Sequence, residues 1–471
     1  MPTTRREFLG ALGATAALAT ASGSVESTPQ RPNLLLLVCD DQRFSTIASL
    51  GWPELETPNL DRLAARGTAF THHCNQGGSN PAVCIAARAQ LLSGRWLPRA
   101  SDHLDAGEPL WPEVLARAGY RTWASGKWHN EPPSFHRGFA DGAALFFGGM
   151  GNPYTLRVWD FNPDGHYPAR AARPVEAHAV EVFSRRTIDF LQSATPGRPF
   201  AAVCAYTLPH DPRLAPAEWH RRYDPARIAM PPNFLSRHPF DNGELTIRDE
   251  QLAPWPRTPE VIARHLADYY ACVSYVDHWV GQILDTLEAR GLASNTVVVF
   301  TADHGIAIGQ HGLMGKQSLY DHSIRVPLLL AGPGVPAGQR RQALTCHADL
   351  APTLLELLGV DQPAGIDGAS LRPLLADPAA RPHDDLLLGY RHFQRGLRTA
   401  EAKLALCRVN GRVTTQLFDL AADPWETRNL AAAEPAKVAD LSERLRAAMK
   451  RDGDPLDLDR PAWGAAEEHR T

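Results

Sequence analysis

The sequence predicts an α/β protein in which a large, doubly wound and mostly parallel sheet is followed by a smaller α+β domain with an antiparallel sheet. Two observations lead to this prediction. Between residues 33 and 358, short apolar runs alternate with longer segments of helical composition. After residue 382, four short strand-like segments follow one another closely and precede one helical segment. We therefore expect a large α/β domain over residues 31–375 and a C-terminal α+β subdomain over residues 376–471.

The apolar runs of the large domain are continuous, which is typical of parallel strands that are buried on both faces. We expect its strands at residues 33–38, 68–72, 120–124, 200–206 and 296–301. We expect its helices at residues 57–67, 84–92, 111–118, 175–191, 259–290 and 349–358. In the C-terminal subdomain we expect strands at 386–390, 396–399, 402–408 and 414–420, and a helix at 435–449.

The composition is that of a globular protein and excludes a nucleic-acid-binding character. The chain has 471 residues, of which 44% are hydrophobic, so it can bury a large core. Its formal net charge is −4, and it contains no long basic run. We therefore expect no nucleic acid partner.

The N-terminus resembles a twin-arginine export signal. Arg5 and Arg6 precede Phe8 and Leu9, a short apolar run follows over residues 10–20, and the run closes on an Ala-Thr-Ala site. The run is too short for a membrane span. We expect residues 1–30 to be signal and linker, and the mature protein to be periplasmic or secreted, with the twin-arginine export machinery as a partner and no integral membrane segment.

The stretch over residues 79–95 holds the most reactive-looking group. Cys84 opens a helical segment and Arg88 follows one turn later, in the pattern C-x-A-x-R. Unpaired N–H groups at a helix start and a nearby guanidinium together favour an oxyanion. The alternative is a buried cysteine on an amphipathic helix beside a surface arginine. The chain has seven cysteines, an odd number with no close pair, so a disulfide scaffold is not indicated, and none of them has a zinc-type spacing.

Polar clusters follow several of the expected strands, and in parallel sheets ligands bind beyond the carboxyl ends of the strands. Asp40 and Asp41 follow the first strand, and Asp303 and His304 follow the last strand of the large domain. Three carboxylates with one imidazole suit Ca²⁺ or Mg²⁺. A pair such as Asp40 and Asp41 can also serve merely as a turn at a strand end.

Cationic side chains accompany these carboxylates. Arg88, Lys127 and Lys316, together with His129 and His210, follow strands or loops at the same edge. Such a set forms a pocket for a multiply charged oxyanion. A solvated surface position is the alternative for each lysine.

Several separate motifs, in order along the chain, resemble those of the formylglycine-dependent sulfatases of the alkaline phosphatase superfamily. They are VCDDQ at 38–42, CIAAR running into LLSGR at 84–95, GKWH at 126–129, PHDP at 209–212, TADHG at 301–305, GKQSLYDHSIRVPL at 315–328 and QLFDLAADPWETRNLA at 416–431. The resemblance spans nearly the whole mature chain. It implies an alkaline phosphatase-like fold, with the sulfatase catalytic domain over residues 31–375.

The resemblance also implies site roles. Cys84 would be converted to formylglycine by a maturation enzyme, and the hydrated aldehyde would be the nucleophile. The predicted metal site, for Ca²⁺ or for Mg²⁺, consists of Asp40, Asp41, Cys84, Asp303 and His304.

The catalytic roles follow from the same resemblance. His210 with Lys316 would protonate the leaving oxygen, and His129 would act as the base that releases sulfate. Arg88 and Lys127 would orient the nucleophile and offset charge on the sulfate oxygens.

Three positions depart from the usual family pattern. Ala86 stands where proline is usual, two residues after Cys84, and His304 stands where many members carry asparagine. Asp321 stands where glutamate is commoner, and we expect it to have a structural role beside Arg325.

Two long segments, residues 135–173 and 211–257, are rich in Pro, Gly and aromatic residues, and we expect surface loops that wall a substrate pocket. The expected substrate-contacting residues are His136, Arg137, Arg237, His238, Arg391, His392 and Arg395. Such residues favour a sulfated carbohydrate as substrate. The alternatives are a formylglycine-dependent phosphonate monoesterase or phosphodiesterase, and an inactive binding protein of the same fold.

Overall fold

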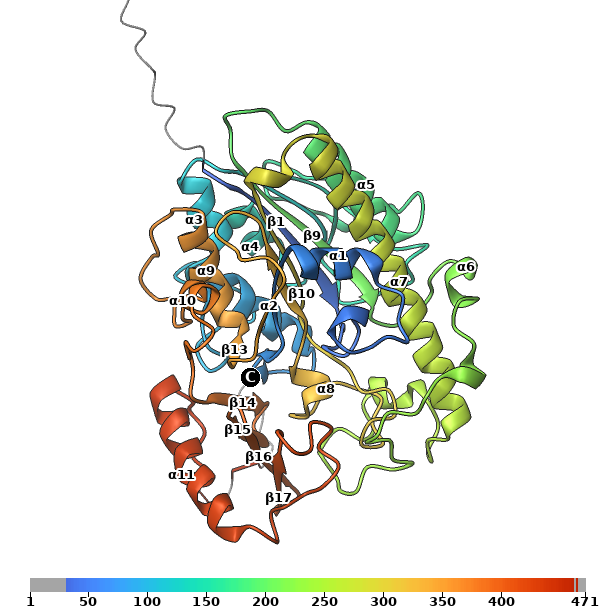
Figure 1. The fold of residues 1–471 in the computed structure, drawn as a ribbon, viewed down its shortest axis with the longest axis vertical. Coiled ribbons are helices and arrows are strands. Elements are labelled where there is room, and N and C mark those ends of the chain that lie inside the picture. Colours follow the sequence, from blue (N-terminus) through green and yellow to red (C-terminus); the bar gives the residue numbers. More distant parts are fainter. Residues whose placement is uncertain (1–30, 461–462, 465–471) are drawn as a thin grey trace, which may run out of the picture. The chain divides into compact units, whose positions relative to one another are not determined.

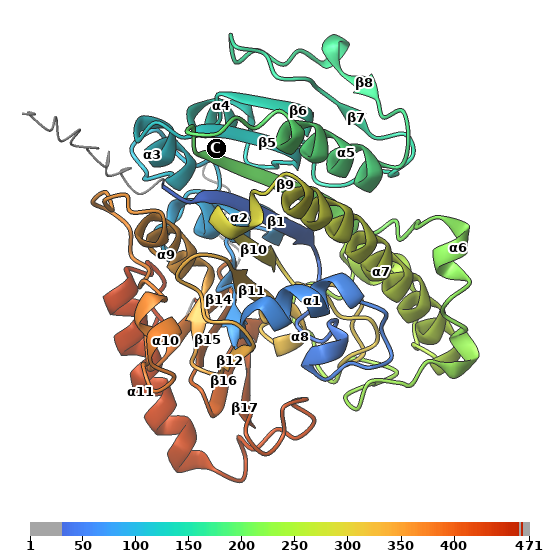
Figure 2. The same cartoon turned by 45° about the horizontal axis from the view of Figure 1, so that its top comes forward.

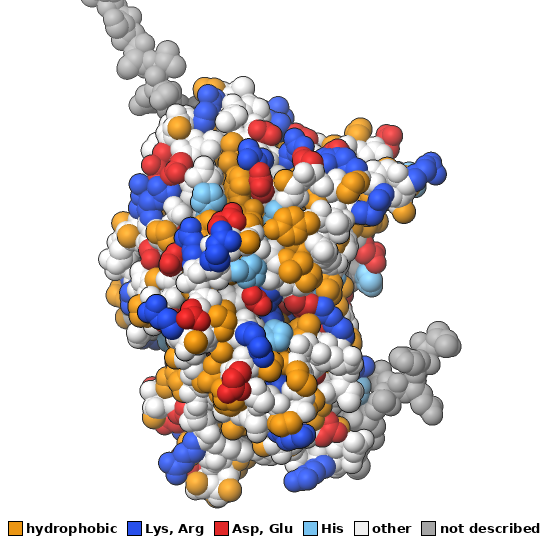
Figure 3. Space-filling view, turned by 90° about the vertical axis from the view of Figure 1, so that its right-hand side faces the viewer, with side chains coloured by type: hydrophobic (Ala, Val, Ile, Leu, Met, Phe, Trp, Pro, Cys, Tyr) orange, Lys and Arg blue, Asp and Glu red, His pale blue; other side chains and the backbone are white. Residues whose placement is uncertain are grey.

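The computed structural model describes residues 31–460 and 463–464. The expected export signal, residues 1–30, lies outside the described residues. From Arg31 onward the chain forms one compact unit. Among the described residues, no helix is both long and apolar enough to cross a membrane. The face shown in Figure 3 mixes basic and acidic side chains rather than presenting a field of one sign.

A central eight-stranded sheet organises the large domain (Figure 1), and its strand order is β12-β2-β11-β10-β1-β9-β5-β6. The strands are β1 (Asn33–Asp40), β2 (Gly67–Phe70), β5 (Arg121–Lys127), β6 (Asp141–Phe146), β9 (Phe200–Pro209), β10 (Thr296–Ala302), β11 (Leu328–Ala331) and β12 (Gln339–Arg341). Neighbours from β10 to β6 pair in parallel, whereas β11 runs antiparallel to β10 and to β2. The mostly parallel sheet predicted from the sequence is confirmed.

Helices cover both faces of this sheet (Figure 2). The helices on one face are α1 (Pro58–Arg66), α5 (Ala179–Gln192) and α7 (Pro259–Ala289), and those on the other are α2 (Val83–Ser93), α3 (Trp111–Arg117) and α9 (Leu350–Leu357). Successive side chains of a strand point to opposite faces. Leu35 and Leu37 of β1 therefore enter the first core and Leu34 and Leu36 enter the second, which is why β1 reads as a continuous apolar run. The doubly wound architecture is confirmed.

The expectation that residues 135–173 form a surface loop is wrong for the first part of this segment. Helix α4 (Pro132–Gly138) buries Phe135 against Trp128, with ring centroids 5.5 Å apart. The following strand, β6, pairs in parallel with β5 at the edge of the main sheet. Its sequence DGAALF is poor in β-branched residues, so the local pattern does not show a strand. The rest of this segment holds the short pair β7 (Arg157–Val158) and β8 (Arg173–Pro174).

Residues 211–257 are mostly irregular, as expected. Their elements are the short helix α6 (Ala217–His220) and the 3-10 turns η3 (Pro225–Arg227) and η4 (Arg248–Leu252). The remaining short elements of the large domain are η1 (Ala48–Leu50), β3 (His73–Cys74), η2 (Ala169–Ala171), η5 (Ala293–Asn295), α8 (Asp321–Ile324), β13 (Thr345–Cys346), η6 (His347–Asp349) and α10 (Arg372–Ala376).

The C-terminal subdomain is an antiparallel sheet packed against one helix. Its elements are β14 (Leu386–Tyr390), β15 (Gln394–Arg398), β16 (Ala402–Val409), β17 (Arg412–Asp419) and α11 (Pro435–Asp452). A fifth strand, β4 (Gly77–Gly78), joins this sheet from the segment before α2 and pairs in parallel with β14. Gly77 has φ +101°, and a Cβ there would lie 2.0 Å from the carbonyl oxygen of Gly389. The predicted C-terminal subdomain thus shares its sheet with the segment that leads into Cys84.

Candidate active site

The carboxyl ends of the parallel strands bring the predicted residues to one edge of the sheet. Asp40 and Lys127 are the last residues of β1 and β5, and His210 and Asp303 follow β9 and β10 directly. Asp41 follows Asp40 with φ +64°, a left-handed conformation that turns the chain away from the strand. The motifs that lie far apart in the sequence therefore converge as expected.

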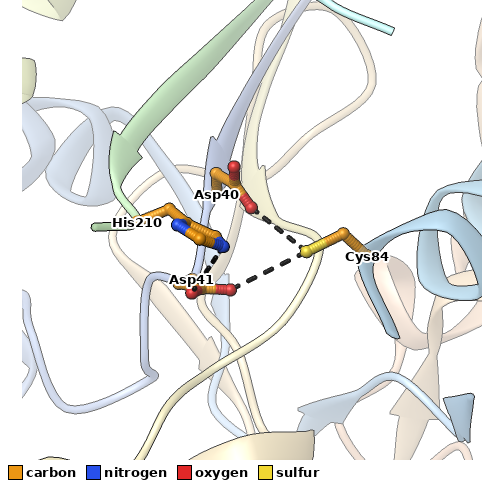
Figure 4. A group of neighbouring side chains, drawn as sticks. All are labelled: Asp40, Asp41, Cys84 and His210. Atoms are coloured by element: carbon orange, nitrogen blue, oxygen red, sulfur yellow. Dashed lines mark hydrogen bonds and ion pairs between the residues drawn. The ribbon is translucent and has the colours of Figure 1, made fainter. Parts of the chain in front are cut away.

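Cys84 lies against both aspartates (Figure 4). Its Sγ is 3.3 Å from Asp40 Oδ1 and 3.9 Å from Asp41 Oδ1, and His210 Nε2 is 3.7 Å from Asp41 Oδ2. One ligand atom from each of these four buried residues lies within 4.8 Å of the others. Cys84 is the second residue of α2, so the sequence placed it correctly at a helix N-terminus.

Two buried lysines neutralise the two aspartates. Lys127 Nζ lies 2.6 Å from Asp40 Oδ2, and Lys316 Nζ lies 2.5 Å from Asp41 Oδ1 and 3.0 Å from Cys84 Sγ. Burial would raise the pKa of Asp40, but the surrounding positive charges, that of Lys127 foremost, together hold it well below its usual range. Burial would lower the pKa of Lys316, but the charge of Asp41 raises it above its ordinary value, so Lys316 stays protonated.

The unmodified thiol of Cys84 is a poor nucleophile in this position. Burial, together with the negative charges of Asp303 and Asp40, raises the pKa of the Cys84 thiol well above its ordinary value. The reactive form of cysteine is the thiolate. The site therefore keeps the sulfur protonated and unreactive.

Arg88 connects Asp303 to the strand that carries Lys127. Its Nε lies 2.8 Å from Asp303 Oδ2, and its Nη1 donates to the carbonyl of Lys127 at 2.7 Å. Its Nη2 is buried and has no hydrogen-bond partner among the described residues. Asp303 Oδ1 accepts the backbone N–H of Asp41 at 3.2 Å. A buried donor without a partner is costly, so Nη2 indicates a site for an anion.

Two histidines at this edge, the buried His304 and the half-buried His129, are neutral. His304 Nδ1 lies 2.9 Å from the carbonyl oxygen of Gly305 and donates to it, which leaves the lone pair on Nε2, and Nε2 has no partner among the described residues. Burial and the charge of Lys316 lower the pKa of His304 well below its ordinary value. Burial and the charge of Lys127 likewise lower the pKa of His129 far below its ordinary value. Each imidazole can therefore act as a lone-pair donor.

The donor set fits a hard divalent cation. Asp40, Asp41 and Asp303 are fully buried carboxylates, and burial raises the pKa of Asp41 to about 6 even though His210 and Lys316 lie close by. Burial rather than a lack of counter-charges causes this rise in pKa, because Arg88, Lys127 and Lys316 pair with the three carboxylates. A cation that prefers oxygen ligands would further favour the ionised form of Asp41. His210, predicted as an acid, belongs to the closest group of four potential ligands, whereas Asp303 and His304 lie outside it.

Sequence reasoning missed a cluster of charges beside His210. His210 Nδ1 donates to the carbonyl of Asp211 at 2.7 Å, and Arg248 pairs with both carboxylate oxygens of Asp211. Asp249 accepts from Gln317 Nε2 at 3.0 Å. Burial would raise the pKa of Asp249, but the nearby charge of Lys316 and the hydrogen bond from Gln317 lower it. The only signal in the sequence was a charged Arg-Asp-Glu triplet inside an irregular segment.

Four expected substrate contacts are engaged with the protein instead. Arg137 binds the carbonyls of Leu104 and Glu108, Arg395 pairs with Asp454, Arg391 pairs with Glu244 and His238 contacts the carbonyl of His311. His136 and Arg237 are exposed, and the His392 ring lies 5.1 Å from that of Phe393. The pairing of Arg137 and Arg395 explains why loop arginines alone are a weak signal of substrate contact.

Asp321 has the structural role that was expected beside Arg325, and it has two closer partners as well. Its carboxylate lies 3.7 Å from Arg325 Nη1, 2.8 Å from Arg398 Nη2 and 2.9 Å from Lys403 Nζ. Lys403 also pairs with Glu426. These buried ion pairs tie α8, just beyond Lys316, to strands β15 and β16 of the C-terminal subdomain.

A second group of potential ligands has an ordinary structural explanation. Asp349 accepts the backbone N–H of Cys346 at 2.7 Å and that of Ala369 at 2.9 Å. His383 Nε2 lies 2.8 Å from Asp349 Oδ1, so an ion pair completes the cluster.

The fold and this edge define the class of protein. A mostly parallel α/β sheet with carboxylates, lysines and neutral histidines at its carboxyl edge, joined to a small antiparallel sheet, is an alkaline phosphatase-like architecture. The family model "Sulfatase" matches residues 32–360, and the model "N-sulphoglucosamine sulphohydrolase, C-terminal" matches residues 309–452. The chain belongs to the sulfatase family and is a sulfuric ester hydrolase.

Known proteins resemble the chain over most of its length. An N-acetylglucosamine-6-O-sulfatase of Bacteroides thetaiotaomicron is 26% identical, over 93% of this chain and 90% of that protein. A solved structure of a protein in complex with its substrate, D-glucosamine-2-N,6-O-disulfate, has a TM-score of 0.76 at 24% identity and covers 90% of this chain and 99% of that one. The structure of the phosphonate monoester hydrolase of Agrobacterium radiobacter has a TM-score of 0.72 at 21% identity, and the match covers 90% of this chain and 96% of that one. Both structures share the fold.

Proposed function

We propose that this protein is an exported sulfatase that hydrolyses a sulfate monoester on a carbohydrate, and that its nucleophile is a formylglycine made from Cys84. The observation that carries the proposal is the position of Cys84 Sγ, which contacts Asp40, Asp41 and Lys316 at the N-terminus of α2. A sulfur that is buried and held protonated cannot attack a sulfate ester. Conversion by a formylglycine-generating enzyme would supply an aldehyde whose hydrate is an oxygen nucleophile.

The carbohydrate substrate is proposed from the relatives. The relative from Bacteroides thetaiotaomicron is named as a sulfatase of a sulfated amino sugar. The solved structure contains a second sulfated amino sugar, D-glucosamine-2-N,6-O-disulfate, as its substrate. Export is proposed from the paired Arg5 and Arg6, which lie outside the described residues. An exported enzyme would meet sulfated polysaccharides outside the cytoplasm.

A divalent cation would be held by Asp40, Asp41, the modified Cys84, Asp303 and His304. Calcium is our first choice and magnesium the second, since the set is dominated by oxygen. When bound, the cation would polarise the sulfate group and offset the charge of the three carboxylates.

The chain's own side chains would handle protons and charge. His210 and Lys316 would protonate the alcohol that leaves, since both lie beside Asp41 on the Cys84 side of the site. His129 would be the base that restores the aldehyde, since its imidazole is neutral and its Nδ1 has no hydrogen-bond partner among the described residues. Arg88 would bind a sulfate oxygen through its unpaired Nη2.

The test has a chemical and a kinetic part. The protein is made together with a formylglycine-generating enzyme, and the peptide that contains Cys84 is examined by mass spectrometry for the aldehyde. Its rates are then measured on 4-nitrophenyl sulfate, on sulfated monosaccharides and on an aryl phosphodiester. We expect the aldehyde and sulfate release. A thiol that persists would contradict the formylglycine nucleophile. A phosphodiester rate far above every sulfate rate would contradict the sulfatase assignment and favour the phosphonate monoesterase or phosphodiesterase alternative.

A further inference from the structure

The 3-10 turn η4 links the two loops that carry the proposed leaving-group acids. Glu250 accepts the backbone N–H groups of Met314 and Gly315, at 3.1 and 2.9 Å, just before Lys316. On the other side, Arg248 Nη1 lies 2.8 Å from an oxygen of Asp211, the neighbour of His210. Two residues of one short turn therefore hold both loops.

The side chain of Arg248 is fixed yet partly open to solvent. Its guanidinium pairs with both oxygens of Asp211, and its Nη1 also lies 3.0 Å from Asp249 Oδ1. The side chain remains 46% exposed, whereas those of Asp211 and Asp249 are 6% and 11% exposed. A guanidinium has five N–H groups. The contacts among the described residues use three of them, so two N–H groups remain for a ligand.

Charge and geometry favour a neutral hydroxyl ligand here. One guanidinium is surrounded by two carboxylates, so these three residues together carry a formal charge of minus one, which disfavours a second sulfate or a carboxylate. A guanidinium donates and a carboxylate accepts, as a sugar diol requires. The group also adjoins His210, the proposed donor of the proton to the leaving alcohol, so the body of that alcohol would lie within its reach.

We propose that Arg248, held by Asp211 and Asp249, is a binding subsite for the neutral hydroxyl groups of the sugar that leaves. The subsite rests on the proposed sulfatase function. It explains why three consecutive charged residues are built into an otherwise irregular segment: the turn places a donor and its acceptors beside the proton donor. Arg248 is then a specificity residue that the attacked sulfate group does not contact.

The test compares a substrate with hydroxyl groups and one without them. Arg248→Ala and the wild type are assayed on a monosulfated monosaccharide and on 4-nitrophenyl sulfate, whose leaving group has no sugar hydroxyls. We expect kcat/KM for the sugar to fall roughly 10- to 100-fold, the usual effect of losing hydrogen bonds to a charged donor, with a rise in KM. The value for the aryl sulfate should fall clearly less than that for the sugar, because Arg248 also holds Asp211 beside His210 but the aryl leaving group offers it no sugar hydroxyls. Arg248→Lys should restore part of the sugar activity.

Arg446→Ala is the matched control, because Arg446 lies on the C-terminal helix α11, is 47% exposed and pairs with Asp459. It should change neither rate. The subsite would be overturned if Arg248→Ala lowered kcat/KM equally for both substrates, or if it did not lower kcat/KM for the sugar. If Arg248→Ala lowered kcat/KM more for a disulfated sugar than for the monosulfated sugar, Arg248 would bind a second sulfate. This result would overturn the assignment to neutral hydroxyl groups. A wild type that releases sulfate from neither substrate would instead refute the proposed function.

Discussion

Lys127 Nζ lies 2.6 Å from Asp40 Oδ2, and neither side chain is exposed to solvent. The two residues are 87 positions apart and end two strands of the same sheet, β5 and β1, which β9 separates. Removing one member of such a pair leaves the other charge buried and unpaired, which is more costly than removing both.

Lys127→Met should therefore destabilise the protein strongly. We expect the free energy of unfolding to fall by roughly 3 to 5 kcal/mol in the presence of a chelator, as measured by urea unfolding. The double variant Asp40→Asn with Lys127→Met should lose less free energy of unfolding than Lys127→Met alone, because it leaves no Asp40 carboxylate without its partner. A double variant that is less stable than the single variant would contradict this account of the pair.

Cys84→Ala should remove turnover and leave the fold intact. We expect kcat on 4-nitrophenyl sulfate to fall roughly a thousandfold or more, as when a covalent nucleophile is removed. The free energy of unfolding should change by less than about 2 kcal/mol. Cys407→Ala is the matched control, since Cys407 is also a buried free cysteine but lies in strand β16 of the C-terminal sheet. Appreciable turnover by Cys84→Ala would refute the nucleophile.

Removal of a divalent cation should lower both activity and thermal stability. A ligand that binds the folded state at 100 times its Kd stabilises it by about 2.7 kcal/mol. We expect a chelator to lower the Tm and Ca²⁺ or Mg²⁺ to restore it, whereas NaCl at equal ionic strength should not. His304→Ala should weaken the response, because the unpaired Nε2 of His304 is one of the proposed ligands. A Tm that does not respond to any divalent cation would argue against the metal site.

Lys403 should matter for stability far more than a surface lysine. It pairs with Asp321 and Glu426, and its side chain is fully buried. Lys403→Met leaves two carboxylates with less compensation, so the free energy of unfolding should fall by roughly 3 to 5 kcal/mol. Lys437→Met is the control, since Lys437 is 39% exposed and lies 3.6 Å from Glu434. Its effect should stay within about 0.5 kcal/mol. If both variants lost a similar free energy of unfolding, burial of Lys403 would not explain its contribution to stability.

The pair of His383 and Asp349 should make stability depend on pH. Burial alone would lower the pKa of His383, but the adjacent Asp349 carboxylate raises it above its ordinary value. The stabilisation is therefore complete below the unfolded pKa of about 6.5 and is lost as the pH rises through the higher folded value.

Thermal unfolding of the wild type and of His383→Gln checks this sign. The wild type should be more stable than the variant by roughly 1 to 3 kcal/mol near pH 5.5, and the difference should shrink toward pH 9. A difference that grows with pH would show that the pKa of His383 is lowered rather than raised.

Much of the site could be predicted from the sequence because the motifs sit at strand ends. A continuous apolar run such as LLLLV identifies a buried parallel strand, and the polar residues after it, Asp40 and Asp41, must lie at the ligand-binding edge. The same reasoning placed Lys127, His210 and Asp303 at that edge. The helix start at Cys84 followed from local composition, so its position at the N-terminus of α2 was also predictable.

Strand β6 and the β4 to β14 pairing could not be predicted in this way. The sequence of β6 is rich in Gly and Ala, and β4 is only two glycines, so neither has a local pattern that indicates a strand. Their pairing depends on neighbours that are distant in the sequence.

The sequence by itself determined the fold class, the family and which residue types gather at the carboxyl edge of the sheet. Only the tertiary structure decided which side chains pair there: Lys127 with Asp40, Lys316 with Asp41 and Cys84, and Arg248 with Asp211. Strand formation depends on local periodicity, which is written along the chain. Ion pairing depends on strand order, register and loop packing, which join residues up to 275 positions apart.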